Sequence, residues 1–284
     1  MTHDVAGVLD AVARFAAGHG VRAEAPVVMS HSSNIVVHLA PAPVVARIAN
    51  VTAAGRDRPD RSLARELALT AHLASLHIPT TAPSAELPPG PHEIGGRWVS
   101  FIEHVSLAPV VDDDAARAGD ALADVIEAMA TFQDPDGLFD RSLADEADVV
   151  LARLEGRIDE GDRQLLLEWR DEAFLPAAED AQPVHADPHR RNIGRRADGE
   201  LVWFDFDDAV CDSRLVDVAT LFRSWPAAGM VAGERLGIDV DGAAVAEHVE
   251  QREAWGGIWG QMFVLELGDE HAAYAAAALA RRRR

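Results

Sequence analysis

The segment between residues 185 and 208 contains residue types that could perform phosphoryl transfer. It reads HADPHRRN over 185–192, and WFDFDD follows over 203–208. Such a transfer needs a carboxylate that orients the attacking hydroxyl and accepts its proton, together with oxygen ligands for a magnesium ion. Asp187 could be that carboxylate. Asn192, five residues further on, and Asp205, at the end of the next expected strand, offer the hard oxygen atoms that magnesium prefers.

Each of these residues also has a simpler interpretation. Asp and Asn are common in turns, so Asp187, Asn192 and Asp205 could each cap a loop, although their combined spacing favours chemistry. His185, Asp187 and His189 form an H-x-D-x-H cluster, and imidazole is a good zinc ligand. A zinc hydrolase is therefore an alternative, but it would leave Asn192 and the Asp205 strand unexplained.

The two motifs together resemble those of the aminoglycoside phosphotransferase and choline-kinase-like families, where H-G-D-x-H-x-x-N precedes a strand ending in D-F-D. The resemblance implies a bilobal, protein-kinase-like α+β fold. Residues 1–103 would form a nucleotide-binding lobe, with a small antiparallel β-sheet and one main helix. Residues 104–284 would form a mostly helical lobe for catalysis and substrate binding. ATP and Mg²⁺ are the implied cofactors, and a small-molecule hydroxyl is the implied phosphate acceptor.

The resemblance also indicates which residues would hold the nucleotide phosphates. Ser32, Ser33 and Asn34 lie in the polar turn that would cover them, and this turn has no glycine. All 26 basic side chains are arginine, so Arg47 stands where the family has a phosphate-binding lysine on its third strand. Glu66, on the following helix, would orient that guanidinium, which binds phosphate through a planar fork.

Residues 97–105 resemble the family's hinge, which receives adenine through backbone groups, and this assigns Glu103 and Val105 to the nucleotide. Asp217 resembles the aspartate of a later D-L-A element and is expected to be a structural anchor. Two positions depart from the family pattern. Ala186 replaces a glycine, which matters only if the position requires a positive φ, and Arg191 stands where glycine is common.

The acceptor site is less defined by the sequence. The net charge is −21, which argues against nucleic-acid binding because phosphates need basic partners. Residues 112–180 contain 21 Asp and Glu against 6 Arg, a surface that could attract a cationic molecule or could simply confer solubility. The Trp residues are also core candidates because of their large apolar area. The acceptor-binding candidates are Asp207, Asp208, Trp255, Trp259 and Glu266.

Composition narrows the class of protein further. No apolar run is long enough for a transmembrane helix, and the first residues do not read as a signal peptide. Cys211 is the single cysteine, so an intrachain disulfide is impossible and secretion is not indicated. We therefore expect a cytoplasmic enzyme with no nucleic-acid or membrane partner.

Hydrophobic periodicity and turn residues predict the elements that must position these side chains. A small group of strands with one long helix comes first, and helices dominate from residue 112 onward. The expected strands are 25–29, 35–39, 44–48, 97–103, 193–196 and 201–205. The expected helices are 6–17, 61–77, 112–132, 142–156, 161–178, 212–225 and 242–280, the last broken near Gly256 and Gly257.

Four functions remain open, and the zinc hydrolase described above is one of them. The leading one is an ATP-dependent phosphotransferase whose acceptor is an aminoglycoside or another cationic antibiotic. A sugar, an amino alcohol or another metabolite fits nearly as well as the acceptor. A catalytically weak nucleotide-binding protein is a further alternative, because the chain lacks both lysine and glycines in the phosphate turn.

Overall fold

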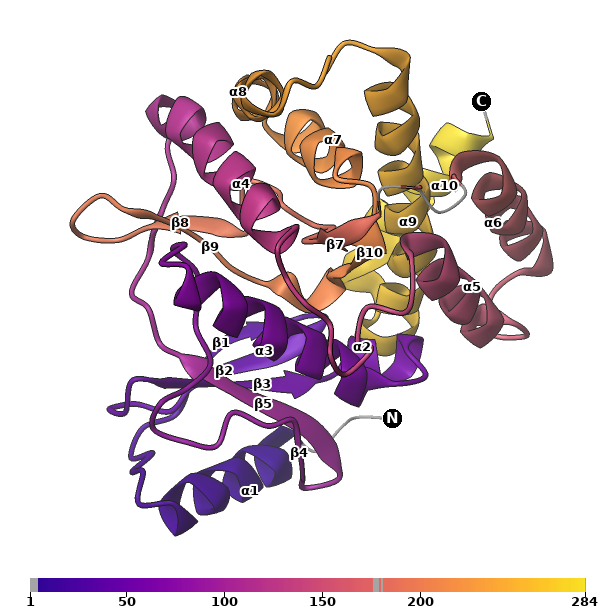
Figure 1. Cartoon of the computed structure of the whole chain (residues 1–284). Helices are drawn as coiled ribbons and strands as arrows, with labels where there is room; N and C mark the ends of the chain where they lie inside the picture. Colours follow the sequence, from indigo (N-terminus) through magenta and orange to yellow (C-terminus); the bar gives the residue numbers. More distant parts are fainter. Residues whose placement is uncertain (1–4, 176–178, 180, 284) are drawn as a thin grey trace.

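The computed structural model of the chain describes residues 5–175, 179 and 181–283. Its first third is built on a five-stranded antiparallel sheet in the order β1–β2–β3–β5–β4, shown at the lower centre of Figure 1. The sheet confirms the small β region expected from the sequence, and β1 extends further into the polar turn than expected. Its strands are β1 (Val27–His31), β2 (Asn34–His38), β3 (Val44–Ala49), β4 (His92–Ile94) and β5 (Arg97–Glu103).

The two faces of this sheet are covered by different helices. Helix α1 (Val5–Gly18) packs on one face, and α3 (Pro59–Ser75) packs on the other (Figure 1). Successive side chains of a strand point to opposite faces. Ala46 and Ile48 of β3 therefore join the core beneath α1, whereas Val45 packs with Leu67 of α3. The same alternation puts Arg47 on the face that α3 covers.

The larger remainder of the chain is mainly helical, and the whole is an α+β fold. One core lies between α4, α7 and α8, and a second lies between α5, α6, α9 and α10. None of the described helices is long and apolar enough to cross a lipid bilayer. The helices are α4 (Ala115–Met129), α5 (Leu143–Leu154), α6 (Glu160–Ala173), α7 (Leu215–Ser224), α8 (Pro226–Leu236), α9 (Ala243–Leu267) and α10 (Ala272–Arg282).

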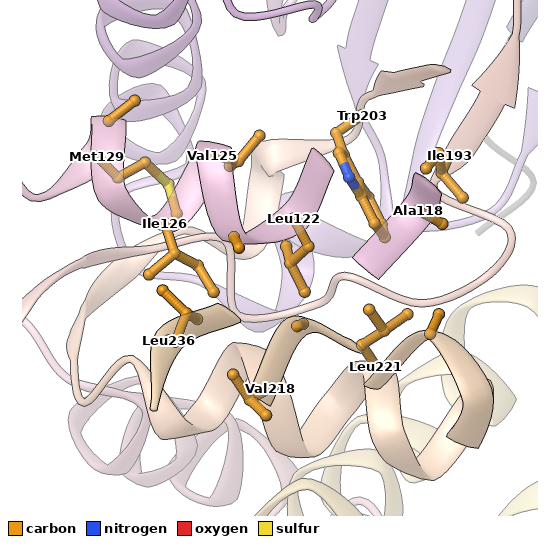
Figure 2. Packing of buried hydrophobic residues seen from close by; sticks show 14 of the residues in the cluster. Ala118, Leu122, Val125, Ile126, Met129, Ile193, Trp203, Val218, Leu221 and Leu236 are labelled. Atoms are coloured by element: carbon orange, nitrogen blue, oxygen red, sulfur yellow. The ribbon is translucent and has the colours of Figure 1, made fainter. Parts of the chain in front are cut away.

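Figure 2 shows how the first of these cores supports the motif region. Leu122 and Ile126 lie four residues apart on α4, so both face α7 and α8, where they meet Leu221 and Leu236. Burying each such side chain contributes about 1.5–3 kcal/mol. Trp203 packs into the same core and is fully buried. Because Trp203 immediately precedes the 204–208 segment, this packing anchors one side of the candidate site.

Two short strand pairs bring the two sequence motifs together. Strand β7 (Gln182–Val184) pairs with β10 (Val210–Asp212), and β8 (Ile193–Arg195) pairs with β9 (Leu201–Trp203). The first motif lies between β7 and β8, and the second lies between β9 and β10. The strands that flank the first motif therefore pair with the strands that flank the second motif. This pairing places the two motif loops side by side. The sequence predicted β8 and β9 but missed β7 and β10.

Several expected helices differ from those in the structure. Helix α9 continues through Gly256 and Gly257, so the predicted break there is wrong. A Cβ on Gly257 would lie 2.7 Å from the Trp169 ring, so close packing offsets a propensity penalty of about 1 kcal/mol per glycine. The break comes at Gly268, which has a φ of 98° that favours glycine.

Two further helices were not predicted, and one predicted boundary was too early. Helix α8 begins at Pro226, which is well suited to the first turn of a helix because its ring fixes φ. The five-residue helix α2 (Val51–Gly55) was too short to show periodicity. Asp212 belongs to β10, so the predicted helix 212–225 starts instead at Leu215. The predicted helix 161–178 ends at Ala173, and residues 176–178 lie outside the described part of the chain.

Candidate active site between the sheet and the helices

Buried polar groups fix the loop that carries Asp187. The Asp217 carboxylate, on α7, accepts hydrogen bonds from the backbone N–H groups of His185 and Ala186 at 3.0 and 2.7 Å. The His185 Nε2 atom lies 3.2 Å from the Phe204 carbonyl, and the Asp187 N–H faces His185 Nδ1 at 3.4 Å. A carbonyl can only accept, so Nε2 carries the proton and Nδ1 accepts. The neutral His185 ring therefore ties one motif to the other.

Ala186 adopts a left-handed backbone conformation, with φ of 65°, and its side chain is fully buried. A glycine would adopt this conformation without strain, whereas the Cβ of an alanine here adds about 1–2 kcal/mol of strain. The alanine that stands in place of the family's glycine therefore has an energetic cost. The Asp217 carboxylate holds the Ala186 N–H at 2.7 Å. The surrounding contacts therefore keep the loop in its strained conformation.

The burial of His185 predicts a specific pH dependence of stability. Burial lowers the pKa of His185 to about 4, whereas histidine in an unfolded chain titrates near 6.5. Between these values the unfolded chain binds a proton that the folded protein does not, so His185 makes stability fall as the pH falls. His185→Gln lacks this response. We expect the stability advantage of the wild type over His185→Gln to shrink by about 2 kcal/mol between pH 7.5 and pH 5.

Urea unfolding of both proteins at the two pH values, without metal, measures that change. Because the comparison is a difference between two proteins, carboxyl groups that titrate in the same range cancel to first order. A stability difference that does not change with pH would show that His185 is not held neutral.

The Asp187 carboxylate is contacted by three side chains. Arg252, on α9, places its Nη2 atom 2.5 Å from Asp187 Oδ1. On the other oxygen, Asn192 Nδ2 lies at 3.4 Å and His189 Nε2 at 3.5 Å. Asn192 Nδ2 also donates to the Asp187 carbonyl at 3.0 Å, which leaves Asn192 Oδ1 as the atom able to bind a cation. The sequence spacing of Asp187 and Asn192 thus produces a direct contact.

Arg47 lies between Asp205 and Glu66. Its Nη2 is 2.5 Å from Asp205 Oδ1, and its Nε is 2.9 Å from Glu66 Oε2. Although burial opposes ionisation, Asp205 and Glu66 raise the pKa of Arg47 above its usual range. Likewise, burial favours neutral Asp205, but Arg47 holds its pKa below the usual value. Asp205 is therefore an ionised carboxylate placed beside a fixed cation.

A second buried arginine binds the carboxylates that follow Asp205. Arg56 lies just after α2, with Nη1 3.0 Å from Asp207 Oδ2 and Nη2 2.5 Å from Asp208 Oδ1. Its guanidinium also lies 5.5 Å from the centre of the Trp259 ring. Asn34 Nδ2 donates to Asp207 Oδ2 at 3.1 Å. Asp207 is thus fixed from two directions by the first third of the chain.

The polar turn after β1 is held by α2 and the residue before it. Asn50 Nδ2 donates to the Ser32 carbonyl at 3.0 Å, and the Thr52 N–H donates to the Ser33 carbonyl at 3.1 Å. Thr52 Oγ1 donates to Asn34 Oδ1 at 2.8 Å. Both ends of the Asn34 amide are therefore bonded within the protein. Asn34, expected to contact phosphate, is placed instead to hold the turn against Asp207.

One cavity is lined by part of this set, whereas Arg47, Glu66 and Asn192 are not among its lining residues. Its volume is about 220 Å³, and its lining joins the two motif loops to the polar turn and to one side of α9 and α10. Ser33 and Thr52 come from the first third of the chain, and a Cβ on Gly55 would lie 2.5 Å from the Trp259 ring, so α2 and α9 meet closely here. The acidic, basic and imidazole side chains of the lining are Asp187, His189, Asp205, Asp207, Asp208, Arg223 and Arg252.

The predicted acceptor-binding residues do not all reach this cavity. Asp207, Asp208, Trp255 and Trp259 line it. Glu266 is not among the lining residues and pairs with Arg157 at 2.7 Å. None of the described residues between 112 and 180, where acidic side chains are concentrated, belongs to the lining. The acidity of that stretch therefore gives no reason to expect a cationic acceptor.

The predicted hinge lies at the end of β5. The Glu103 N–H donates to the Ala82 carbonyl at 2.9 Å, and the Glu103 carboxylate accepts from the Ala82 N–H at 3.1 Å. His104 N–H donates to the Pro43 carbonyl at 2.9 Å, and the His104 ring stacks on His38 with centroids 3.6 Å apart. These contacts fix the backbone just before Val105, which follows the strand.

Sequence reasoning missed Arg56 and Arg252, and both had a detectable signal. Arg252, Trp255 and Trp259 are spaced by three and four residues, so a helix places them on one face; the two Trp residues had already been identified as candidates. Arg56 gave a weaker signal. In a chain without lysine, each buried carboxylate that needs a cation must be matched by an arginine.

The histidine cluster does not form a metal site in this structure. Both His185 ring nitrogens are engaged, one with the Phe204 carbonyl and the other with the Asp187 N–H. Across the described residues, no group of three or more His, Cys, Asp and Glu side chains is arranged to hold a metal ion. The ring contacts of His185 count against the zinc hydrolase alternative.

Comparison with solved structures finds the same fold in several small-molecule kinases. The chain is similar to the choline kinase LicA from Streptococcus pneumoniae, with 14% identity over 90% of this chain and 94% of that one, and a TM-score of 0.62. It is similar to APH(2")-IIa in a streptomycin–ATP ternary complex, with 11% identity over 99% and 97% of the chains and a TM-score of 0.60. Macrolide 2'-phosphotransferase MphH from Brachybacterium faecium gives 17% identity over 95% and 98%, with a TM-score of 0.57.

At these identities the similarities establish the fold alone. Comparison with curated protein sequences finds no match. The sequence profile of the phosphotransferase enzyme family, however, matches residues 29–248. That range contains β2, β3, α3 and both motif loops, and so includes Arg47, Arg56 and the carboxylates that they contact, whereas Arg252 lies beyond it. The chain therefore belongs to the phosphotransferase enzyme family.

Proposed function

We propose that this protein is an ATP-dependent phosphotransferase that moves the γ-phosphate to a hydroxyl group of a small molecule. The observation that carries the proposal is that Asp187 and Asp205, from separate motifs, line one cavity together with Ser33 of the polar turn. In the proposed arrangement residues 1–103 form the nucleotide-binding lobe and residues 104–284 the catalytic lobe. The backbone of Glu103 and Val105 would face adenine.

In this reaction Asp187 orients the acceptor hydroxyl and takes its proton. The hydroxyl oxygen forms a bond to the γ-phosphorus while the bond from that phosphorus to the bridging β-oxygen breaks, and ADP leaves. Arg47 would bind the transferred or neighbouring phosphate, because its guanidinium stays charged and has fork geometry. Ser32 and Ser33 would cover the phosphates from the turn after β1.

The donor atoms available near Asp187 suit Mg²⁺. Asp205 supplies an ionised carboxylate and Asn192 an amide oxygen, and Mg²⁺ is commonly bound by one or two such protein ligands together with substrate phosphates. When bound, Mg²⁺ would neutralise charge on the phosphates. Arg47 contacts Asp205 through Oδ1 at 2.5 Å, so Oδ2 is the Asp205 oxygen that would serve the metal.

This assignment predicts metal-dependent nucleotide binding. ATP at 100 times its Kd should stabilise the wild type by about 2.7 kcal/mol, and only when Mg²⁺ is present. Asp205→Ala should remove the stabilisation, and Asn192→Ala should weaken it. Asp198→Ala, in the exposed β8–β9 turn, is the matched control and should behave as the wild type. Equal stabilisation with and without Mg²⁺ would contradict the metal assignment.

The acceptor is tested by ATP consumption over a panel of aminoglycosides, macrolides, amino alcohols, sugars and hydroxy acids. Turnover that depends on one acceptor, with a phosphorylated product detected by mass spectrometry, would establish the function. Antibiotics remain candidates, as do metabolites. ATP binding without turnover on any acceptor would instead support the alternative of a catalytically weak nucleotide-binding protein.

A further inference from the structure

The reaction proposed above assigns no role to Arg252. It lies on α9, on the same helical face as Trp255 and Trp259, and all three line the cavity. Its side chain is only 8% exposed, and Nη2 lies 2.5 Å from Asp187 Oδ1. Arg252 is thus a fixed cation beside the carboxylate that would hold the acceptor hydroxyl.

Each of the four aspartates of the cavity lining contacts an arginine, and Arg56 is shared by two of them. Asp205 lies 2.5 Å from Arg47, Asp207 and Asp208 lie 3.0 and 2.5 Å from Arg56, and Asp187 lies 2.5 Å from Arg252. Each aspartate of the lining is therefore already paired. A cationic acceptor would meet no unpaired aspartate beside Asp187, and it would meet the positive charge of Arg252 directly.

We propose that Arg252 determines acceptor specificity by binding an oxygen-rich, preferably carboxylate, group next to the phosphorylated hydroxyl, and by disfavouring an ammonium group there. This inference rests on the proposed function. A hydroxyl that donates to Asp187 Oδ1 at about 2.8 Å lies no more than about 5.3 Å from Arg252 Nη2, given the 2.5 Å contact. A substituent on the neighbouring carbon therefore falls within direct reach of the guanidinium.

Two properties of Arg252 strengthen its discrimination between a carboxylate and an ammonium group on the acceptor. Its Nη2 carries two hydrogens, so one N–H remains for an acceptor group after the other is given to Asp187. The guanidinium is also mostly removed from water, so counterions screen its charge poorly. The preferred acceptor class is therefore a hydroxy acid or an equally oxygen-rich molecule, and simple amino alcohols are the disfavoured class.

The test uses three acceptors on one carbon skeleton, namely glycerate, glycerol and 3-aminopropane-1,2-diol. If none is turned over, the same three serve as competitive inhibitors of whichever acceptor the panel identifies. We expect the wild type to prefer the carboxylate over the amine at least tenfold in kcat/KM or in inhibition constant. Arg252→Gln should bring this ratio to within about threefold of one, and Arg252→Lys should retain most of it.

The ratio is measured on a single preparation, so partial unfolding of a variant does not change it. Arg235→Gln, which removes an exposed arginine paired with Asp124, controls for the loss of one positive charge and should keep the wild-type ratio. A wild type that accepts the amine as well as the carboxylate would overturn the inference. So would an Arg252→Gln protein with an unchanged ratio and a raised ATP KM, since Arg252 would then serve the nucleotide.

If the protein is not a phosphotransferase, the same assays give a different result. In that case the wild type would consume no ATP with any acceptor in the presence of Mg²⁺, and the inference about Arg252 would fall with it. Acceptor-dependent ATP consumption without the carboxylate preference would instead keep the phosphotransferase and reject only the role of Arg252.

Discussion

Asp187→Asn is expected to reduce turnover by about 10²–10⁴-fold, the usual contribution of a positioned general base, while leaving the ATP affinity nearly unchanged. The substitution keeps the shape of the side chain but removes its ability to accept the hydroxyl proton. It also replaces the charged partner of Arg252, which lies 2.5 Å away. Steady-state kinetics with the identified acceptor, together with ATP-dependent thermal stabilisation, separates chemistry from nucleotide binding.

The matched control is Asp136→Asn, which changes an exposed aspartate in a turn. It should retain wild-type turnover. If Asp187→Asn kept near-wild-type turnover on the true acceptor, Asp187 would not be the catalytic carboxylate. The family membership and the fold would be unaffected by that result.

Arg47→Ala is expected to raise the ATP KM at least tenfold, to lower turnover, and to destabilise the protein by about 3–5 kcal/mol. The loss of stability follows because the buried Glu66 and the adjacent Asp205 would lose the cation that they share. Arg47→Lys should keep part of both functions, since it keeps the charge but loses the fork. Glu66→Ala should give a milder defect in ATP binding, because it removes the group that orients the guanidinium.

A double variant distinguishes the stability effect from the nucleotide effect. Arg47→Met combined with Glu66→Gln removes both charges, so no buried glutamate is left unpaired, and stability should recover by several kcal/mol relative to Arg47→Ala. The ATP KM should remain high. Recovery of ATP binding along with stability would show that Arg47 is structural and does not bind the phosphates.

Much of the fold and of the candidate site could be predicted from the amino-acid sequence. Six of the strands and the long helices follow from local periodicity, because each element buries one face. Asp187, Asn192 and Asp205 were predicted from residue type and spacing, since phosphoryl transfer needs a proton-accepting carboxylate and oxygen ligands for a metal ion. The side of β3 that carries Arg47 follows from the two-residue repeat of a strand, and this places Arg47 on the face covered by Glu66 and α3.

Short elements could not be predicted in the same way. Strands β7 and β10 have three residues each, and α2 has five, so none contains enough repeats to show a period. Their existence depends on partners that are distant in the sequence. These are nevertheless the elements that bring the two motif loops side by side and carry Arg56 to Asp207 and Asp208.

The sequence alone determined the family, the catalytic chemistry that is feasible and the candidate residues for it, because these depend on residue type and local spacing. Only the tertiary structure decided which charges face one another. Arg252 reaches Asp187 across 65 residues and Arg56 reaches Asp208 across 152, and no described residue of the acidic stretch 112–180 belongs to the cavity lining. Electrostatic interactions depend on distance in space and on burial. Net charge along the chain therefore could not predict the charge of the site.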